Sequence, residues 1–296
     1  MRYAIVILST VLAGFAGFGA ASCGTQEGAQ VAGPTPTAPG SAGSQPVETV
    51  DPDEPTETAG GEDILTLEVW YTKGESLYLS HVGVPSTQRV GVAAVEWLLR
   101  GPAEQGVETA IPAGTRLLGL NIEDGIATID LTSEFEEGGG SLSMTMRLAQ
   151  VVFTLTQFPT VDGVRFRLDG REIDVFSGEG IVLDHPVTRS DYEELVPVIV
   201  VEAPQPGAVS SPVTVSGTAN VFEANVTVVI LDADGNELAR TFTTATCGTG
   251  CRGDFSVDVE YEVDNPQRGT IVVQDDDAAG TGTPPHQVHI PVLLQP

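Results

Sequence analysis

The spacing of apolar residues changes near residues 185–195, a polar and charged stretch, and this change divides the folded part of the chain in two. Before it, helical spacing of apolar residues alternates with strand-like runs. After it, short runs rich in β-branched residues recur between turn residues, and no helical period appears. At 296 residues the chain is long enough for two ordinary domains. We therefore predict an α+β domain over residues 64–184 and an all-β sandwich over residues 196–296.

The first part mixes strands with two helices. We expect its first helix to follow Pro85, with Ser86 or Thr87 as N-cap, and to end at Gly101 before Pro102. Asp124-Gly125 is a strong hairpin signal. The expected order is strands at 64–71 and 77–84, the first helix, a hairpin of 117–122 and 126–131, a helix capped by Ser141 and running to about Phe158, and a strand at 164–168. Strands and helices in this order predict helices on one face of a mixed sheet.

The second part contains short β-rich runs separated by turn residues such as Asp232-Ala-Asp-Gly235. We expect strands at residues 196–201, 213–217, 226–231, 255–261, 269–273 and 288–294. Several short strands at these spacings predict a β-sandwich.

Several motifs connect both parts to known families. Residues 95–102, 109–115, 124–131, 150–159 and 164–170 together resemble the GerMN domain of sporulation and spore-germination proteins. In the second part, residues 200–207, 213–217, 219–224, 253–255 and 290–294 resemble the immunoglobulin-like domain of bacterial spore germination. Residues 275–280 depart from the more regular strand entry of that family. The resemblance implies an envelope lipoprotein with no catalytic residues to carry over, and it does not imply sporulation.

The N-terminal segment has the pattern of an export signal. Arg2 is followed by apolar or small residues, and Ala20-Ala21-Ser22 precedes Cys23. Because residues 20–23 resemble a bacterial lipobox, we expect a signal peptide at 1–22 and a lipid on Cys23. Residues 24–61 offer almost nothing to bury, so we expect 23–63 to be a disordered tether. The alternative is that the N-terminal segment stays as an uncleaved membrane anchor.

The number of cysteines fits this layout. The chain has three cysteines, and a lipid on Cys23 would leave Cys247 and Cys251 as a pair. Outside the cytoplasm this pair should form a disulfide. The alternative is a metal site shared with His286 and His289, but the spacing matches no standard zinc pattern.

The charge of the chain excludes some partners. It has 13 basic and 41 acidic residues and a formal net charge of -28. So acidic a chain repels nucleic-acid phosphates and anionic lipid headgroups. We therefore expect no nucleic-acid binding, and a membrane contact only through a lipid anchor.

No arrangement of residue types predicts catalysis. The sequence has no G-x-S-x-G elbow and no phosphate-binding loop at its single lysine, Lys73. We expect structural roles for Asp124 and Asp130, and a turn or edge role for Glu223. Asp275, Asp276 and Asp277 are weak candidates for calcium, because consecutive aspartates do not all point inward.

Two polar residues on the second helix leave a choice open. Gln150 and Thr154 are four residues apart and share one helix face. They either anchor neighbouring loops or mark a partner surface.

These observations predict a non-catalytic lipoprotein on the outer face of the cytoplasmic membrane. We expect it to bind or scaffold an envelope protein or cell-wall component, with no cofactor and no resident metal. Two alternatives remain open: a sensor that binds wall glycans or calcium, and an enzyme that modifies the cell wall.

Overall fold

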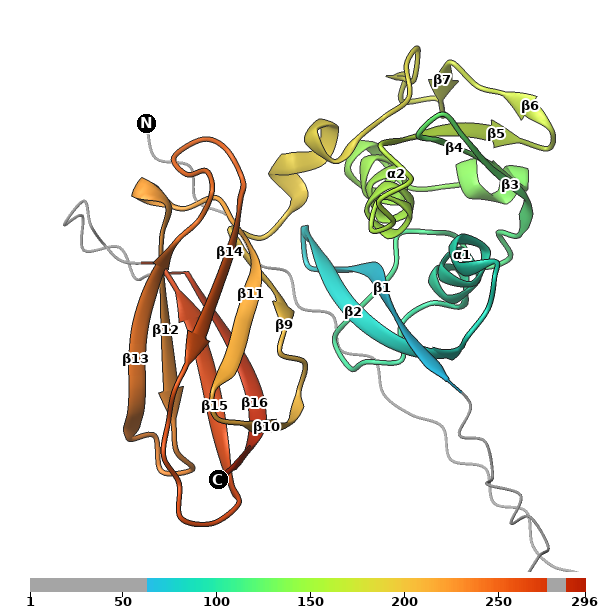
Figure 1. The fold of residues 1–296 in the computed structure, drawn as a ribbon. Coiled ribbons are helices and arrows are strands. Elements are labelled where there is room, and N and C mark those ends of the chain that lie inside the picture. Colours follow the sequence, from blue (N-terminus) through green and yellow to red (C-terminus); the bar gives the residue numbers. More distant parts are fainter. Residues whose placement is uncertain (1–62, 276–285) are drawn as a thin grey trace, which may run out of the picture. The chain divides into compact units, whose positions relative to one another are not determined.

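The computed structural model describes residues 63–275 and 286–296 (Figure 1). The expected signal peptide, the lipidation site Cys23 and the tether therefore lie outside the described residues. Asp276 and Asp277 lie outside them as well. Within the described ranges, no helix has both the length and the apolar character needed to cross a membrane.

The first part begins with a long hairpin. Strands β1 (Ile64–Lys73) and β2 (Ser76–Pro85) pair antiparallel over ten residues without a register shift. Helix α1 (Val90–Arg100) follows, and Gly91, Ala94, Val95 and Leu98 form its fully buried face. The expected N-cap at Ser86 or Thr87 is wrong, because the helix starts later and Arg89 occupies the N-cap position. The expected end at Gly101 is confirmed: Gly101 is the C-cap, at φ 82°.

A four-stranded mixed sheet follows, in the order β3-β4-β5-β6. Its strands are β3 (Leu117–Glu123), β4 (Ile126–Leu131), β5 (Gly163–Leu168) and β6 (Arg171–Glu172). Strands β3 and β4 form the predicted hairpin, with Asp124 and Gly125 both at positive φ. Strands β4 and β5 are parallel, so the chain must cross over between them.

The crossover contains the short helix η1 (Ser133–Glu136) and helix α2 (Ser141–Leu155). Helix α2 is buried from Met146 to Leu155, and its apolar residues join the sheet and the hairpin in one hydrophobic core. The N-cap is Gly140, not the expected Ser141. The helix also ends three residues before the expected Phe158, with Thr156 as C-cap.

Short elements complete this part of the chain. Strands β7 (Val175–Phe176) and β8 (Ile181–Val182) form a two-residue pair, and the short helix η2 (Arg189–Leu195) follows. Phe176 is fully buried and its ring lies 5.3 Å from that of Phe135. This pair therefore anchors the end of the domain to the core.

The second part is a β-sandwich of two sheets. One sheet has the order β10-β16-β15-β12-β13 and the other β14-β11-β9. The strands are β9 (Ile199–Ala203), β10 (Gly207–Ser210), β11 (Val213–Ala219), β12 (Asn225–Leu231), β13 (Glu237–Thr244), β14 (Gly253–Val259), β15 (Gln267–Gln274) and β16 (Gln287–Gln295), with the short helix η3 (Phe222–Ala224) before β12. The six expected strands are present.

Two strands of the sandwich are absent from the sequence prediction. Strand β10 has four residues, and β13 has no buried residue. Both lie at the edges of their sheet. An edge strand needs fewer apolar residues, so neither gives the pattern on which the prediction depends.

Candidate functional surfaces

A row of polar side chains on α2 and just after it, Gln150, Thr154 and Gln157, lies against the outer edge of β1. We call it the polar row. Gln157 accepts from Glu68 N (2.9 Å) and donates to Glu68 O (2.6 Å). Thr154 Oγ1 accepts from Trp70 N (3.1 Å), and Gln150 Nε2 donates to Trp70 O (3.0 Å). The polar row therefore satisfies backbone groups of β1 that a further strand would otherwise bind.

Next along β1, the backbone continues this pattern. Thr72 and Glu108 exchange two N–H···O bonds of 2.8 Å. Gln150 Oε1 also accepts from Ala110 N (2.9 Å), which fixes the same loop. Both Gln150 and Thr154 are 0 % exposed. Of the two roles left open by the sequence, the structure shows the anchoring role and leaves no accessible surface at these residues for a partner.

Arg147 is a second buried anchor on α2, and the sequence analysis missed it. The residue is 3 % exposed, and its guanidinium donates to four carbonyl oxygens, those of Ala110, Phe135, Glu137 and Gly138, at 2.8–2.9 Å. Burial lowers its pKa. Arginine is rarely buried without a paired carboxylate. The apolar pattern of the helix therefore gave no reason to expect Arg147 in the core. Its chemistry is structural: it ties two loops to α2.

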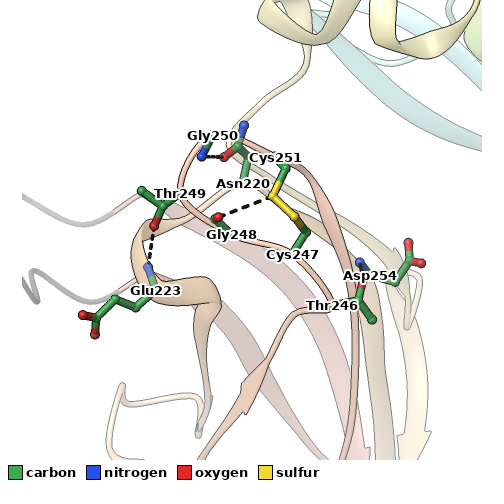
Figure 2. Close-up of a disulfide and its surroundings, with 9 residues drawn as sticks. All are labelled: Asn220, Glu223, Thr246, Cys247, Gly248, Thr249, Gly250, Cys251 and Asp254. Atoms are coloured by element: carbon green, nitrogen blue, oxygen red, sulfur yellow. Dashed lines mark hydrogen bonds between the residues drawn. A yellow bond between two sulfur atoms is a disulfide. The ribbon is translucent and has the colours of Figure 1, made fainter.

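Figure 2 shows the disulfide between Cys247 and Cys251 and the loop that it closes. Thr249 Oγ1 accepts from Glu223 N (2.9 Å), and Gly250 N donates to Asn220 Oδ1 (3.1 Å). The loop is thus bonded to the turn that carries η3.

Two glycines allow this close approach between backbones. A Cβ on Gly248 would lie 2.4 Å from Ala224 N, and one on Gly253 would lie 2.0 Å from Cys247 N. Both distances are far below van der Waals contact. The turn itself also has unusual geometry, with Glu223 at φ 53° and Ala224 at φ 58°. The expected turn role of Glu223 is confirmed.

The candidate metal residues that the structure describes do not come together. Among residues 63–275 and 286–296, no three histidine, cysteine, aspartate or glutamate side chains lie close enough to hold an ion. The sulfurs of Cys247 and Cys251 are joined to each other. His286 Nδ1 lies 2.9 Å from Asp275 Oδ2, and His289 Nε2 lies 3.3 Å from Gln287 Oε1.

The carboxylates named from the sequence have separate local roles. Asp124 lies in the tight turn between β3 and β4. Asp130 Oδ1 accepts from Gly170 N (3.0 Å) and so fixes the turn between β5 and β6. Asp275 accepts from the backbone N–H of His286, where β15 and β16 separate. Asp130 and Asp275 therefore bind backbone groups, and the expected structural role of Asp130 is confirmed.

The other histidines lie in the first part. His81, on β2 opposite Glu68, is partly buried, and burial lowers its pKa despite the nearby carboxylate. His185 is exposed, and its hydrogen bond to Asp184 raises its pKa.

Comparison with known families identifies both parts of the chain. Residues 69–174 match the family described as sporulation and spore germination, and residues 198–281 match the immunoglobulin-like domain of bacterial spore germination. The chain carries a GerMN domain followed by a spore-germination immunoglobulin-like domain. The resemblance inferred from the sequence is therefore confirmed, and so is the fold class.

The chain is similar to the spore germination protein GerM of Bacillus subtilis, with 26 % identity over 153 residues. This match covers 50 % of the chain and 40 % of the relative, so the chain spans less than half of the relative's length. Two solved structures from the same organism are similar. The first GerMN domain of GerM has 23 % identity and a TM-score of 0.39, and the match covers 43 % of this chain and 99 % of that one. The tandem GerMN domains have 15 % identity and a TM-score of 0.41, with 79 % and 61 % covered.

Proposed function

We propose that this protein is a lipid-anchored, non-catalytic component of the cell envelope that binds or scaffolds a partner at the outer face of the cytoplasmic membrane. One observation carries the proposal: the order of sequence features. An apolar leader, a lipobox-like Ala20-Ala21-Ser22-Cys23 and a long polar stretch precede two domains that match spore-germination families.

The contacts of the conspicuous polar groups support a non-catalytic role. Gln150, Thr154 and Arg147 are buried and bonded to backbone, and Asp130 fixes a turn. These contacts stabilise the first domain, and the three buried side chains are shielded from solvent. The names of the similar proteins refer to sporulation and germination and to no chemical reaction.

The anchor is tested by the mass of the mature N-terminus in a bacterial host with lipoprotein processing. We expect a chain that begins at Cys23, carries acyl chains and fractionates with membranes. More than one buried acyl chain is needed for stable anchoring. A Cys23→Ser variant should lose both the added mass and the membrane fraction. An unmodified N-terminus on a cytosolic product, with free thiols at Cys247 and Cys251, would refute the proposal.

The scaffolding role needs a separate test. The anchored chain should be cross-linked in intact cells and purified, with the Cys23→Ser variant as the control for location. Reproducible enrichment of one envelope protein or wall fragment supports the proposal. Enrichment of none, from a correctly anchored chain, contradicts it.

A further inference from the structure

The two outer edges of the β1–β2 hairpin differ in the hydrogen bonding of their backbone groups. Backbone groups of Glu68, Trp70 and Thr72 point away from β2 and are bonded to the polar row and to Glu108. In an antiparallel pair, alternate residues direct their N–H and C=O groups to opposite sides. The groups of Leu67, Val69 and Tyr71 therefore point toward β2.

The register shows which residues of β2 pair with Leu67, Val69 and Tyr71. Leu67 faces Val82, Val69 faces Ser80 and Tyr71 faces Tyr78, with no shift along the ten pairs. Just beyond the hairpin, Ser86 N donates to Asp63 O, which continues the same alternation. The backbone groups of the intervening residues, Leu77, Leu79, His81 and Gly83, therefore point to the free side of β2.

No hydrogen bond within residues 63–275 and 286–296 reaches the backbone groups of these four residues. Leu77 is 1 % exposed, whereas Leu79 and His81 are half-buried and Gly83 is exposed. We call the backbone groups of Leu79, His81 and Gly83 the open edge. Backbone N–H and C=O groups in folded proteins are normally hydrogen-bonded to protein or to water. A row of such groups without a protein partner on a long strand is a template for another strand.

The other edge strands described in the structure are each protected. Strands β6, β7, β8 and β10 have two to four residues. The pairings of β3, β9 and β13 contain register shifts. Strand β14 is engaged by Thr246, which exchanges two bonds with Asp254, and by Thr243. Strand β2 has ten residues, no shift and no proline before Pro85. Short strands, bulges and covered edges prevent unwanted pairing, so their absence from β2 points to a binding edge.

Charge decides what kind of strand fits. Glu68 lies opposite His81, and Glu104 Oε1 accepts from Tyr78 Oη (2.7 Å), so two carboxylates lie near the open edge. The basic groups nearby are Lys73, 5.1 Å from the Tyr78 ring, and Arg189, 5.8 Å from the Trp70 ring. The whole chain has 41 acidic and 13 basic residues, so a second copy is repelled and a basic segment is attracted.

We propose that the open edge of β2 binds an extended, basic segment of a partner protein, which adds a strand to the β1–β2 hairpin. This mode draws its affinity from main-chain hydrogen bonds and its preference from charge. The inference rests on the proposed scaffolding function and gives that function a surface and a class of partner.

The test uses the full chain, residues 1–296, labelled with ¹⁵N, and a synthetic nine-residue peptide of alternating valine and lysine. In the free protein, the amides of Leu79 and His81 should exchange rapidly with solvent, and those of Ser80 and Val82 slowly. Added peptide should slow exchange at Leu79 and His81 and leave Ser80 and Val82 unchanged. This alternation separates strand addition from contact with a side-chain surface, and its absence upon saturation would overturn the proposal.

Variants test the same edge. Leu79→Pro removes an outward N–H and keeps the inward pairing, so it should weaken peptide binding about tenfold or more. Leu79→Ala keeps the N–H and should bind within about threefold of the original chain. Equal binding by the two variants overturns the proposal. If Leu79→Pro fails to fold, the amide-exchange pattern of the unaltered chain with peptide still tests whether a strand is added at this edge.

Two further probes test the class of occupant. A peptide of alternating valine and glutamate should bind at least about tenfold more weakly, and equal binding would contradict a basic occupant.

Sedimentation of the full chain should show no concentration-dependent dimer. A dimer that Leu79→Pro abolishes would assign the edge to a second copy and overturn the proposal. If the peptide does not bind while the anchored chain still enriches an envelope partner, the scaffolding function stands and this edge is excluded.

Discussion

Both domains fix loops with bonds that lie outside their strand ladders, but they do so over different distances along the chain. In the GerMN domain, Gln150 and Trp70 are 80 residues apart in sequence, and Arg147 reaches Ala110 across 37 residues. In the immunoglobulin-like domain, the disulfide joins residues four apart. The first device connects distant segments through one buried helix, and the second closes one local loop.

This difference shows where each domain is sensitive to mutation. A buried polar group that loses its partner costs its full desolvation penalty, whereas a short covalent ring mainly restricts the unfolded chain. We therefore expect the largest losses of stability at α2 and smaller losses at the disulfide loop.

The largest expected effect is that of Arg147→Met. This change leaves four carbonyl oxygens without their donor, so the unfolding free energy of the GerMN domain should fall by about 3 kcal/mol. Calorimetry of the full chain measures it as a downward shift of one unfolding transition. The control Arg165→Met removes an exposed pair with Glu172 and should change stability by at most about 1 kcal/mol. Equal losses in both variants would contradict the buried role.

Gln150→Leu should have the next largest effect, a loss of roughly 2–3 kcal/mol. The change leaves Trp70 O and Ala110 N unpaired, and both are held by the Gln150 amide. Faster amide exchange at Ala110 would report the loss locally. Gln105→Leu, at an exposed position, is the matched control and should leave both stability and exchange unchanged.

The sequence predicts much of this architecture but not the residues that hold it together. Glycine, proline and apolar spacing locate the β1–β2 hairpin, the β3–β4 turn and the end of α1, because these depend on local geometry. The N-caps of both helices were predicted wrongly, because Arg89 and Gly140 lack a capping side chain and no local signal distinguishes them.

Long-range polar contacts are harder to predict. Gln150 and Thr154 are visible as polar residues on an apolar helix, but their partner on β1, Trp70, is 80 and 84 residues away. Arg147 and Gln157 resemble ordinary surface residues in the sequence. Only the three-dimensional structure shows that both bind backbone. The open edge of β2 is invisible to sequence patterns for the same reason: it follows from which side of the hairpin the polar row covers.

Removal of the disulfide should have a smaller effect, confined to the second domain. The Cys247→Ser, Cys251→Ser double variant should lose about 2 kcal/mol, because a short ring removes little entropy from the unfolded chain. Calorimetry should show this loss in a different transition from the one that Arg147→Met shifts. Reductant should lower the stability of the second domain in the original chain to that of the double variant, and should leave the stability of the double variant unchanged. A shift in the Arg147-sensitive transition would contradict a local role.

Two tyrosines sharpen the comparison, because each donates its hydroxyl toward two backbone carbonyls. Tyr71 reaches Trp97 O (3.0 Å) and Gly101 O (3.2 Å), and Tyr261 reaches Val209 O (2.7 Å) and Gln295 O (3.1 Å). Each Tyr→Phe change should cost about 1 kcal/mol in its own domain. If the two Tyr→Phe variants lose equal, small amounts of unfolding free energy, the domains do not differ in their tyrosine contacts. The unequal losses at Arg147 and at the disulfide would then account for the difference between the domains.

The pH dependence of Tyr71 gives the last and smallest prediction. Burial raises its pKa from 10.0 to about 12, while Arg100 opposes the shift. Between these two values the folded state keeps the phenol proton that the unfolded state loses, so deprotonation favours unfolding. The contribution of Tyr71 to stability is therefore present below pH 10 and falls as the pH rises toward 12. Thermal unfolding midpoints at pH 9 to 12 should decline less steeply for Tyr71→Phe than for the original chain, with the remaining decline caused by the raised pKa values of Tyr78 and Tyr192. Identical slopes would show that the Tyr71 hydroxyl is not shielded from solvent.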